Sequence, residues 1–224
     1  MDFTAVAHDL RTPLHAMLGH TRLLAVESLT DAGRHRLEVI EAQIHWMATL
    51  LDGCLPLPAS PRRVTMVDLN ATIHDVIAEL DGLLPRRRIQ VSRGGEERLP
   101  LIAGNASDLH RVLVNLFVNA ADAMPDGGRI MICARTDRLP AAPFAALVID
   151  VTDTGVGIPL ELVPHVFDRG FTTKPPGLGS GLGLAICRDI VEAHGGHIEL
   201  TTRRGHGTTV RVSLPVAAGV FDAV

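Results

Sequence analysis

Two glycine-rich stretches stand in fixed order in this chain, and they constrain what it can fold into more than any other feature. The first reads Asp153-Thr154-Gly155-Val156-Gly157-Ile158-Pro159, and the second reads Gly177-Leu178-Gly179-Ser180-Gly181-Leu182-Gly183-Leu184 before a helical pattern. Closely spaced glycines let backbone N–H groups approach an anion, and a helix N-terminus adds partial positive charge. A carboxylate such as Asp153 is instead suited to accept a hydrogen bond from an amine. One loop for phosphates and one for a base together predict a nucleotide pocket.

The spacing of the glycines excludes two commoner nucleotide motifs. The chain contains no G-x-x-x-x-G-K-[ST] sequence, so it is not a P-loop protein. The second stretch has Leu182 where a dinucleotide fingerprint requires its last glycine. A glycine run alone would also fit a flexible surface loop, and it is the combination of the two stretches that favours a ligand site.

Composition narrows the class of protein further. The chain has 224 residues, of which 46% are hydrophobic, enough for one large domain or two modest ones. A net charge of −4 and only 3% aromatic residues argue against nucleic-acid binding. Cys54, Cys133 and Cys187 lack metal-ligand spacing and fit packing in a reducing cytosol. No apolar run reaches the ~18 residues of a membrane helix, so we expect a cytoplasmic protein or the cytosolic core of a larger sensor.

The first third of the chain predicts a helical hairpin. Apolar residues recur at alternating spacings of four and three, as at the a and d positions of a heptad repeat. These positions are Phe3, Ala7, Leu10, Leu14, Met17, Thr21 and Leu24 in the first helix, and Leu37, Ile40, Ile44, Met47 and Leu51 in the second. Thr30 can cap the second helix. Because one hairpin cannot bury this seam alone, residues 1–55 are predicted to dimerise as a four-helix bundle.

Beyond a proline-containing linker at 56–63, the pattern changes to α+β. Strands are predicted at 64–67, 89–92, 99–103, 129–135, 144–152, 197–202 and 208–214, and helices from Asp68 to about Leu84, at 106–124 and at 181–194. Strands interrupted by a few helices indicate one antiparallel or mixed sheet with helices on one face. We therefore expect a domain at 64–215 and a loose tail at 216–224.

Two amides lie within an otherwise apolar helical segment. Asn115 and Asn119 stand four residues apart and therefore share one helix face. Their carbonyl oxygens can bind Mg²⁺, and their NH₂ groups can donate to phosphate. A pair of surface amides is the simpler interpretation in general, but amides among apolar neighbours need partners, which favours a ligand site here.

Taken together, these motifs resemble those of two-component sensor histidine kinases. Asn115…Asn119, Asp153-x-Gly155-x-Gly157, Phe167…Phe171 and Gly177–Gly183 are similar, in order, to the N, G1, F and G2 boxes, and Gly205-His206-Gly207-Thr208 with Leu214-Pro215 is similar to the closing strand. His8-Asp9-Leu10-Arg11-Thr12-Pro13 resembles the phospho-acceptor box. The resemblance covers residues 1–215. It implies a helical hairpin forming a dimeric four-helix bundle, followed by an α/β sandwich ATP-binding domain of the GHKL (Bergerat) type.

The resemblance implies roles for three residues of the hairpin. His8 would be the phospho-acceptor. Asp9 would accept the imidazole proton from the other ring nitrogen, which leaves a neutral, nucleophilic nitrogen for the γ-phosphoryl group. Thr12 is similar to the residue that positions a water for removing phosphate from the partner protein.

In the ATP-binding domain, the resemblance implies that Asp153 binds the adenine amino group and that Asn119 binds the Mg²⁺ ion. Asn115 would lie by the phosphates, and residues from about Leu160 to Ser180 would form a mobile lid over ATP. The remaining expected nucleotide-binding residues are Gly155, Gly157, Lys174, Gly179, Ser180, Gly181, Leu182, Gly183 and Thr208.

One position departs from the family's pattern. Many members have a basic residue three positions after the second Asn, where this chain has Asp122, so one cationic phosphate contact is expected to be missing. The string from Asn119 to Pro125, with Gly127-Gly128, is similar to the nitrogen-regulator branch of the family.

The implied function is ATP-dependent autophosphorylation of His8 and transfer to an Asp of a response regulator receiver domain, with phosphatase activity towards the regulator as a further expectation. Gyrase, Hsp90 and MutL-type ATPases share the N and G1 regions but typically carry a Glu where Asn115 stands, and an Asn cannot act as a general base. A non-catalytic dimeric scaffold is the other alternative. It predicts loss of His8, Asn119 or Asp153, and all three are present.

Overall fold

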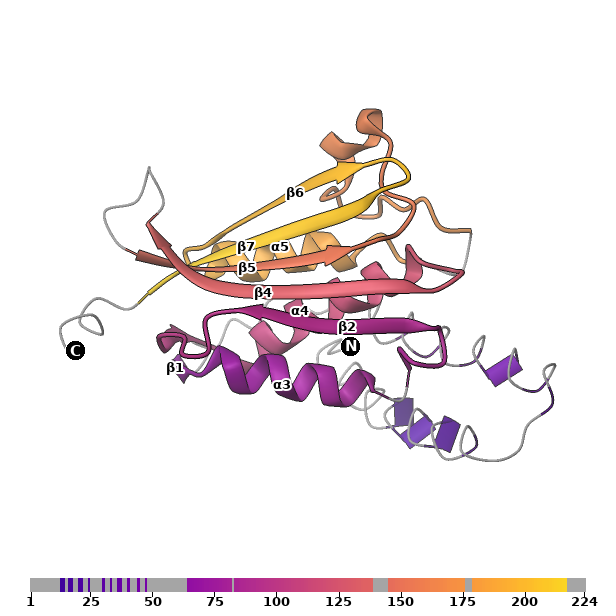
Figure 1. Cartoon of the computed structure of the whole chain (residues 1–224), viewed down its shortest axis with the longest axis horizontal. Coiled ribbons are helices and arrows are strands. Elements are labelled where there is room, and N and C mark those ends of the chain that lie inside the picture. Colours follow the sequence, from indigo (N-terminus) through magenta and orange to yellow (C-terminus); the bar gives the residue numbers. More distant parts are fainter. Residues whose placement is uncertain are drawn as a thin grey trace, which may run out of the picture. The chain divides into compact units, whose positions relative to one another are not determined.

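The structure, a computed structural model, describes scattered positions between 13 and 47 and residues 64–81, 83–138, 145–175 and 179–216 (Figure 1). The chain divides into two compact units. One comprises Met1–Pro61 and Asp168–Gly183, and the other comprises Arg62–Phe167 and Leu184–Val224.

The second unit is built on a mixed five-stranded sheet in the order β2-β4-β5-β7-β6. Its strands are β2 (Ile89–Gly95), β4 (Gly128–Arg138), β5 (Ala145–Asp153), β6 (His197–Arg203) and β7 (Gly207–Pro215). β2 and β4 are parallel, whereas the other neighbours are antiparallel. A separate antiparallel pair joins β1 (Thr65–Val67) to β3 (Ile102–Gly104). The mixed sheet that the sequence predicts is confirmed, but β1 and β3 form a second sheet instead of joining it.

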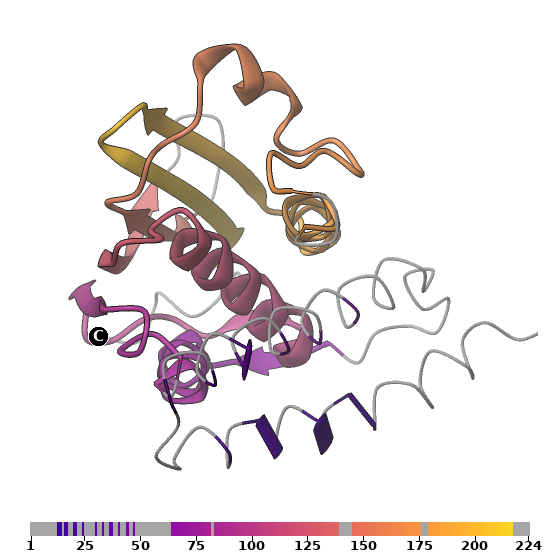
Figure 2. The same ribbon diagram turned by 90° about the vertical axis from the view of Figure 1, so that its right-hand side faces the viewer.

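Three helices of this unit cover one face of the sheet: α3 (Leu69–Leu80), α4 (Ala106–Asp122) and α5 (Gly183–Ala193) (Figure 2). Side chains under 2% exposed fill the layer between them and the strands, among them Phe117, Ile73, Ile190, Ile130, Ile132 and Ile149. The predicted N-cap of α3 is confirmed, because Asp68 Oδ1 accepts the N–H groups of Asn70 at 2.8 Å and Ala71 at 3.4 Å. The arrangement is the expected α+β class, with a sheet on one side and helices on the other.

Several element boundaries differ from the prediction for local reasons. Helix α3 ends at Leu80 rather than near Leu84, because the chain turns there, with the N–H groups of Leu83 and Leu84 both donating to the carbonyl of Leu80. Helix α5 begins at Gly183 rather than Gly181, because Gly181 has a left-handed φ of 66° that an α-helix cannot include.

The end of the domain also differs from expectation. Val216 is buried, and its N–H donates to the carbonyl oxygen of Ala145 at 3.1 Å. This residue therefore continues the packing of β7 against β5 and is not part of a loose tail. Residues 217–224 lie outside the described residues.

In the first unit, the described positions of the predicted seam fall into two sets. Leu14, Thr21, Leu37 and Ile44 are buried, whereas Met17, Leu24, Ile40 and Met47 are 37–51% exposed. Within each set the two positions of each helix are seven residues apart, so each set occupies one heptad position per helix. The predicted cap of the second helix is confirmed, since the N–H of Gly33 donates to Thr30 Oγ1 at 3.2 Å.

Candidate nucleotide-binding site

Asp153 is the centre of the candidate site in the second unit. It ends β5 opposite the buried Ile130, on the face that the helices cover, and is only 6% exposed. Its Oδ1 accepts the N–H of Gly155 at 2.8 Å and the N–H of Thr208 at 3.2 Å. Burial raises the pKa of this carboxyl above its ordinary value, and the two N–H donors oppose that effect. Both bonds are to Oδ1, and no bond to Oδ2 is made by a described residue.

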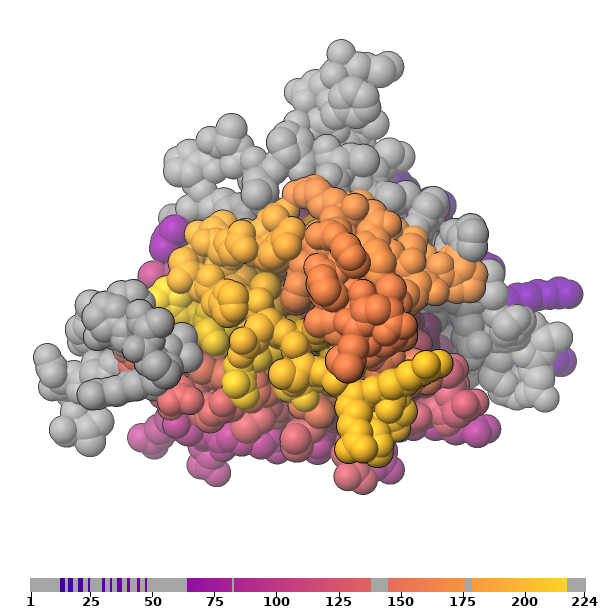
Figure 3. Space-filling view, turned by 90° about the horizontal axis from the view of Figure 1, so that it is seen from above, coloured from indigo at the N-terminus to yellow at the C-terminus, as the bar shows by residue number. Residues whose placement is uncertain are grey.

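The β6–β7 turn holds Thr208 in place beside Asp153. Thr202 and Thr208 face each other across the hairpin, with their hydroxyl oxygens 3.0 Å apart. Thr202 Oγ1 donates to the carbonyl of Gly207 at 3.1 Å and accepts the N–H of Ile158 at 2.9 Å. The hydroxyl of Thr202 thus connects the first glycine-rich loop to the β6–β7 turn. Figure 3 shows the segment that follows this loop (orange) beside the β6–β7 strands (yellow).

Two glycines of the site are required by close backbone approach. A Cβ on Gly155 would lie 2.4 Å from the carbonyl oxygen of Ala123, at the end of α4. A Cβ on Gly207, whose φ is 95°, would lie 1.9 Å from the carbonyl oxygen of Asp153. The N–H of Val156 also donates to the Ala123 carbonyl at 3.1 Å. The backbone of the loop after β5 therefore packs closely between the end of α4 and the start of β7. Gly157 lies in the same loop.

Asn115 and Asn119 lie half-buried on α4, about two turns and one turn before that contact, respectively. The Nδ2 group of Asn115 is buried and has no hydrogen-bond partner within the described residues. Its neighbour on α5 is Cys187, whose Sγ lies 3.8 Å from the carbonyl oxygen of Val112. Burial raises the pKa of the Cys187 thiol to about 12, against opposing effects of Asn115 and Arg111. This fully buried, protonated thiol has the packing role that the sequence predicts.

The second glycine stretch, up to Gly183, belongs to the first unit, together with the preceding residues from Asp168 onward. The N–H of Gly170 donates to the carbonyl of Gly181 at 2.9 Å, and the N–H of Leu182 donates to Ser180 Oγ at 3.2 Å. A Cβ on Gly179 would lie 2.6 Å from Thr172 Oγ1 and 3.0 Å from carbons of Lys174. Gly183 is the first residue of α5. Gly179 and Gly181 thus lie against residues 170–174, just before the N-terminus of α5.

The two phenylalanines of the F box belong to different units, Phe167 to the second and Phe171 to the first. Phe167, in the second unit, packs under the guanidinium of Arg188 of α5, whose Cζ is 6.0 Å from the ring centroid. The segment before it, expected to form a lid, begins with the 3₁₀ helix η1 (Leu160–His165).

Some expected site residues are not placed. His8, Asp9, Thr12 and the first two residues of the second glycine stretch lie outside the described residues. In the ranges that the structure does describe, no group of three or more His, Cys, Asp or Glu side chains could hold a metal ion. A surface hollow of about 490 Å³ is lined by Arg88, Gln90, Gly128, Arg129 and Thr154, and contains none of the residues predicted to bind nucleotide.

Two residues of this region were not predicted from the sequence. Thr202 is one, although the hairpin centred on Gly205 could have paired it with Thr208. Arg87 is the other, since its Nη1 lies 2.6 Å from Asp122 Oδ1. The unusual Asp122 was a signal at one end of this ion pair, but nothing in the sequence identified its partner 35 residues away.

Comparison with known families matches both regions of the chain. Residues 104–218 match the family described as histidine kinase-, DNA gyrase B-, and HSP90-like ATPase. Residues 3–55 match the His Kinase A (phospho-acceptor) domain. The chain therefore belongs to the two-component sensor histidine kinases, and its larger domain is of the ATP-binding type that this family shares with gyrase B and HSP90.

Individual relatives agree with this assignment. The chain is 32% identical over 214 residues to the sensor histidine kinase ZraS of Escherichia coli (strain K12), a match covering 94% of this chain and 44% of ZraS. It is 31% identical over 228 residues to the sensory histidine kinase/phosphatase NtrB of Rhizobium meliloti (strain 1021), covering 96% of this chain and 58% of NtrB. The chain thus spans about half the length of these two relatives.

Solved structures show the same fold. The catalytic domain of histidine kinase ThkA has a TM-score of 0.59 and 29% identity, covering 68% of this chain and 95% of that domain. Full-length ShkA in complex with AMPPNP has a TM-score of 0.67 at 23% identity, covering 95% of this chain and 45% of ShkA, and supports the fold alone. Within the described residues, no helix is both long and apolar enough to span a membrane.

Proposed function

We propose that this chain is the kinase core of a two-component system. It would transfer the γ-phosphoryl group of ATP to His8 and then to an Asp of a response regulator receiver domain. The observation that carries the proposal is the buried Asp153, whose Oδ1 is held by two backbone N–H groups. Its Oδ2 is left to accept a hydrogen bond from the adenine amino group.

The residues near Asp153 fit a nucleotide. The buried Nδ2 of Asn115, without a partner among the described residues, is a donor suited to a phosphate oxygen. Asn119, one turn further along α4, would hold Mg²⁺ through its amide oxygen, and the ion would offset phosphate charge. Gly155 brings the loop backbone close to the end of α4, the helix that carries the two amides, and Gly157 brings it close to Arg203 at the β6–β7 turn.

The second glycine stretch would supply the phosphate contacts of a lid. Lys174 would add a cation, and the backbone N–H groups of Gly179, Ser180, Gly181 and Gly183 would face phosphate at the start of α5. In the structure the N–H of Leu182 donates to Ser180 Oγ, so this contact must rearrange if Leu182 is also to donate to the nucleotide.

The chemistry at His8 is a displacement at the γ-phosphorus. A neutral imidazole nitrogen attacks, the bond to the β–γ bridging oxygen breaks, a P–N bond forms, and ADP leaves. Asp9 would take the proton from the other ring nitrogen, so that the phosphorylated ring is not left positively charged. Transfer to the regulator then breaks the P–N bond and forms an acyl phosphate on its Asp. Thr12 would position the water that later hydrolyses that acyl phosphate.

The described seam positions support a homodimer. Met17, Leu24, Ile40 and Met47 remain 37–51% exposed while the alternate heptad positions are buried. A second copy of the hairpin would cover this apolar set and complete a four-helix bundle, as expected for the matched phospho-acceptor domain. Since the reaction consumes ATP, we expect it to take place in the cytoplasm.

The test is incubation of the chain with γ-labelled ATP and Mg²⁺, wild type beside His8→Gln. We expect acid-labile, base-stable label on the wild type and none on the variant. Label that persists in His8→Gln would overturn the assignment of the acceptor. Free phosphate without labelled protein would indicate an ATPase instead. ATP binding with neither product would indicate a scaffold, provided that light scattering shows a dimer.

A further inference from the structure

The ion pair between Arg87 and Asp122 lies at the end of the polar face of α4 that carries the two site amides. We propose that Arg87 is a positioning residue for nucleotide binding: by neutralising Asp122, it removes a negative charge that would otherwise repel the triphosphate. This inference rests on the proposed ATP site.

The positions on α4 establish which face is involved. Asn115, Asn119 and Asp122 lie within about 60° of one another around the helix axis, at 100° per residue. His110 lies on the opposite side, about 180° from Asn119, and its Nε2 is 3.2 Å from Glu79 Oε2 of α3. The face with the two amides and Asp122 is therefore turned away from α3.

Arg87 contacts the C-terminal end of that face through Asp122. It belongs to the turn between α3 and β2, and its Nη1 lies 2.6 Å from Asp122 Oδ1, with side-chain exposures of 28% and 25%. The turn is held against the start of β4, because the N–H of Gly128 donates to the carbonyl of Arg88 at 3.2 Å. The guanidinium thus contacts the last residue of α4 from a turn whose backbone is hydrogen-bonded to β4.

The local charges explain why such a cation is needed. Asp122 is the last residue of α4, where the helix dipole already contributes partial negative charge. It stands three residues after Asn119, a rise of about 4.5 Å along the helix. A carboxylate there, partly shielded from solvent, would repel the phosphates of a nucleotide bound at the two amides. The pairing with Arg87 cancels that charge while leaving further guanidinium N–H donors.

The experiment compares ATP and adenosine affinities, measured by calorimetry with Mg²⁺ present. Arg87→Gln should weaken ATP binding about tenfold, the effect of one like-charge interaction of ~1.4 kcal/mol, and leave adenosine binding within about twofold. The loss should shrink in high salt, which screens the carboxylate. Asp122→Asn in the Arg87→Gln background should restore ATP affinity, because no charge is left to neutralise.

The matched control is Arg88→Gln, which removes the next arginine of the same turn. Arg88 is exposed and has no ion pair within the described residues, so its loss should leave ATP affinity within about twofold. If Arg87→Gln does not fold, the reversed pair Arg87→Asp with Asp122→Arg restores the ion pair and should bind ATP like wild type.

Two results would overturn the inference. An unchanged ATP affinity in Arg87→Gln would show that the pair has no effect on the nucleotide. An equal loss of ATP and adenosine, or no recovery on adding Asp122→Asn, would show a purely structural role. Failure of the proposed function is distinguishable from both, because wild type itself would then bind no ATP.

Discussion

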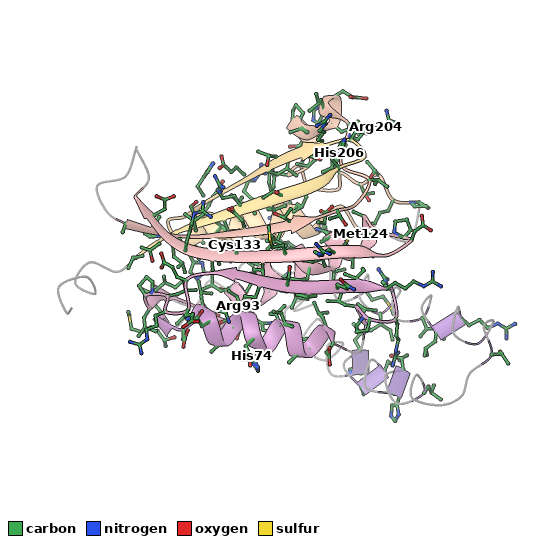
Figure 4. The ribbon with its side chains drawn as sticks, in the orientation of Figure 1. His74, Arg93, Met124, Cys133, Arg204 and His206 are labelled. Atoms are coloured by element: carbon green, nitrogen blue, oxygen red, sulfur yellow. The ribbon has the colours of Figure 1, made fainter. Side chains whose placement is uncertain are left out.

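Strand β5 carries two aspartates three residues apart that have opposite surroundings. Asp150 pairs with Cys133 of β4, which Figure 4 labels, and forms ion pairs with two arginines. Because it is three residues from Asp153, it lies on the opposite, open face of the sheet. Its Oδ2 is 2.8 Å from Arg135 Nη1, and its Oδ1 is 2.7 Å from Arg211 Nε. Asp153 lies on the helix-covered face and accepts only backbone N–H groups from its described neighbours.

The difference appears in the two carboxyl groups' acidities. Burial acts to raise the pKa of Asp150, but the hydrogen bonds from Arg211 and Arg135 outweigh it and lower the pKa. For Asp153, burial dominates and raises the pKa, with only Gly155 and Thr208 opposing. A carboxylate with two cations stabilises the sheet, whereas a buried carboxylate without one lowers stability and retains a free acceptor for a ligand.

The largest expected effect comes from disrupting the turn that supports Asp153. Gly207→Ala would place a Cβ 1.9 Å from the Asp153 carbonyl oxygen at a φ of 95°. We expect it to lower the free energy of unfolding by at least about 3 kcal/mol and to abolish ATP binding. Urea unfolding and calorimetry measure both.

Gly205→Ala is the matched control in the same turn. Gly205 also has a left-handed φ, of 75°, but a Cβ there would meet nothing within 4 Å. It should cost only about 1 kcal/mol, the strain of the backbone alone. Equal losses in the two variants would show that steric contact with Asp153 is unimportant.

The next effect concerns Asp153 itself. Asp153→Asn keeps an oxygen for Gly155 and Thr208 but presents an NH₂ group to the adenine amine. Losing a hydrogen bond to a charged group, worth about 1.5–3 kcal/mol, should weaken ATP binding roughly 10- to 150-fold. The Tm should be no lower than that of wild type, since the variant no longer buries a charge. A large drop in Tm with unchanged ATP affinity would reverse the roles of the two aspartates.

Asp150→Asn should give the opposite result, with a smaller effect. The side chain of Asp150 is 13% exposed, but its partners Arg135 and Arg211 are 32% and 40% exposed, so solvent screens the pairs. We expect a loss of about 1 kcal/mol in the free energy of unfolding, with ATP affinity within about twofold of wild type. A loss of ATP binding here would mean that the open face also contributes to the site.

The contrast between the two aspartates was only partly predictable from sequence. The order of the motifs, the N-cap Asp68 and the hairpin around Gly205 follow from local patterns, because each depends on neighbours a few residues apart. The same holds for Asp153, which the glycines after it identify.

The remaining features depend on contacts between distant segments. Arg211 reaches Asp150 from 61 residues away, and Arg87 reaches Asp122 from 35 residues away. Such pairings follow from strand order and from which turn lies at the end of α4. Composition and periodicity determine neither the strand order nor the position of this turn. The parallel pairing of β2 with β4 was not predicted either.

The smallest effect is the pH dependence of stability, and its sign separates the two aspartates. The lowered pKa of Asp150 means that its contribution is present above the ordinary value of 3.8 and is lost as the pH falls through its folded pKa. The raised pKa of Asp153 means the reverse: its contribution is present below 3.8 and is lost as the pH rises through its folded pKa. Relative to wild type, Asp150→Asn should therefore become less stable, and Asp153→Asn more stable, between about pH 3 and pH 6. Urea unfolding of the three proteins across this range measures both differences, and curves that run in the same direction would refute the assignment of opposite environments.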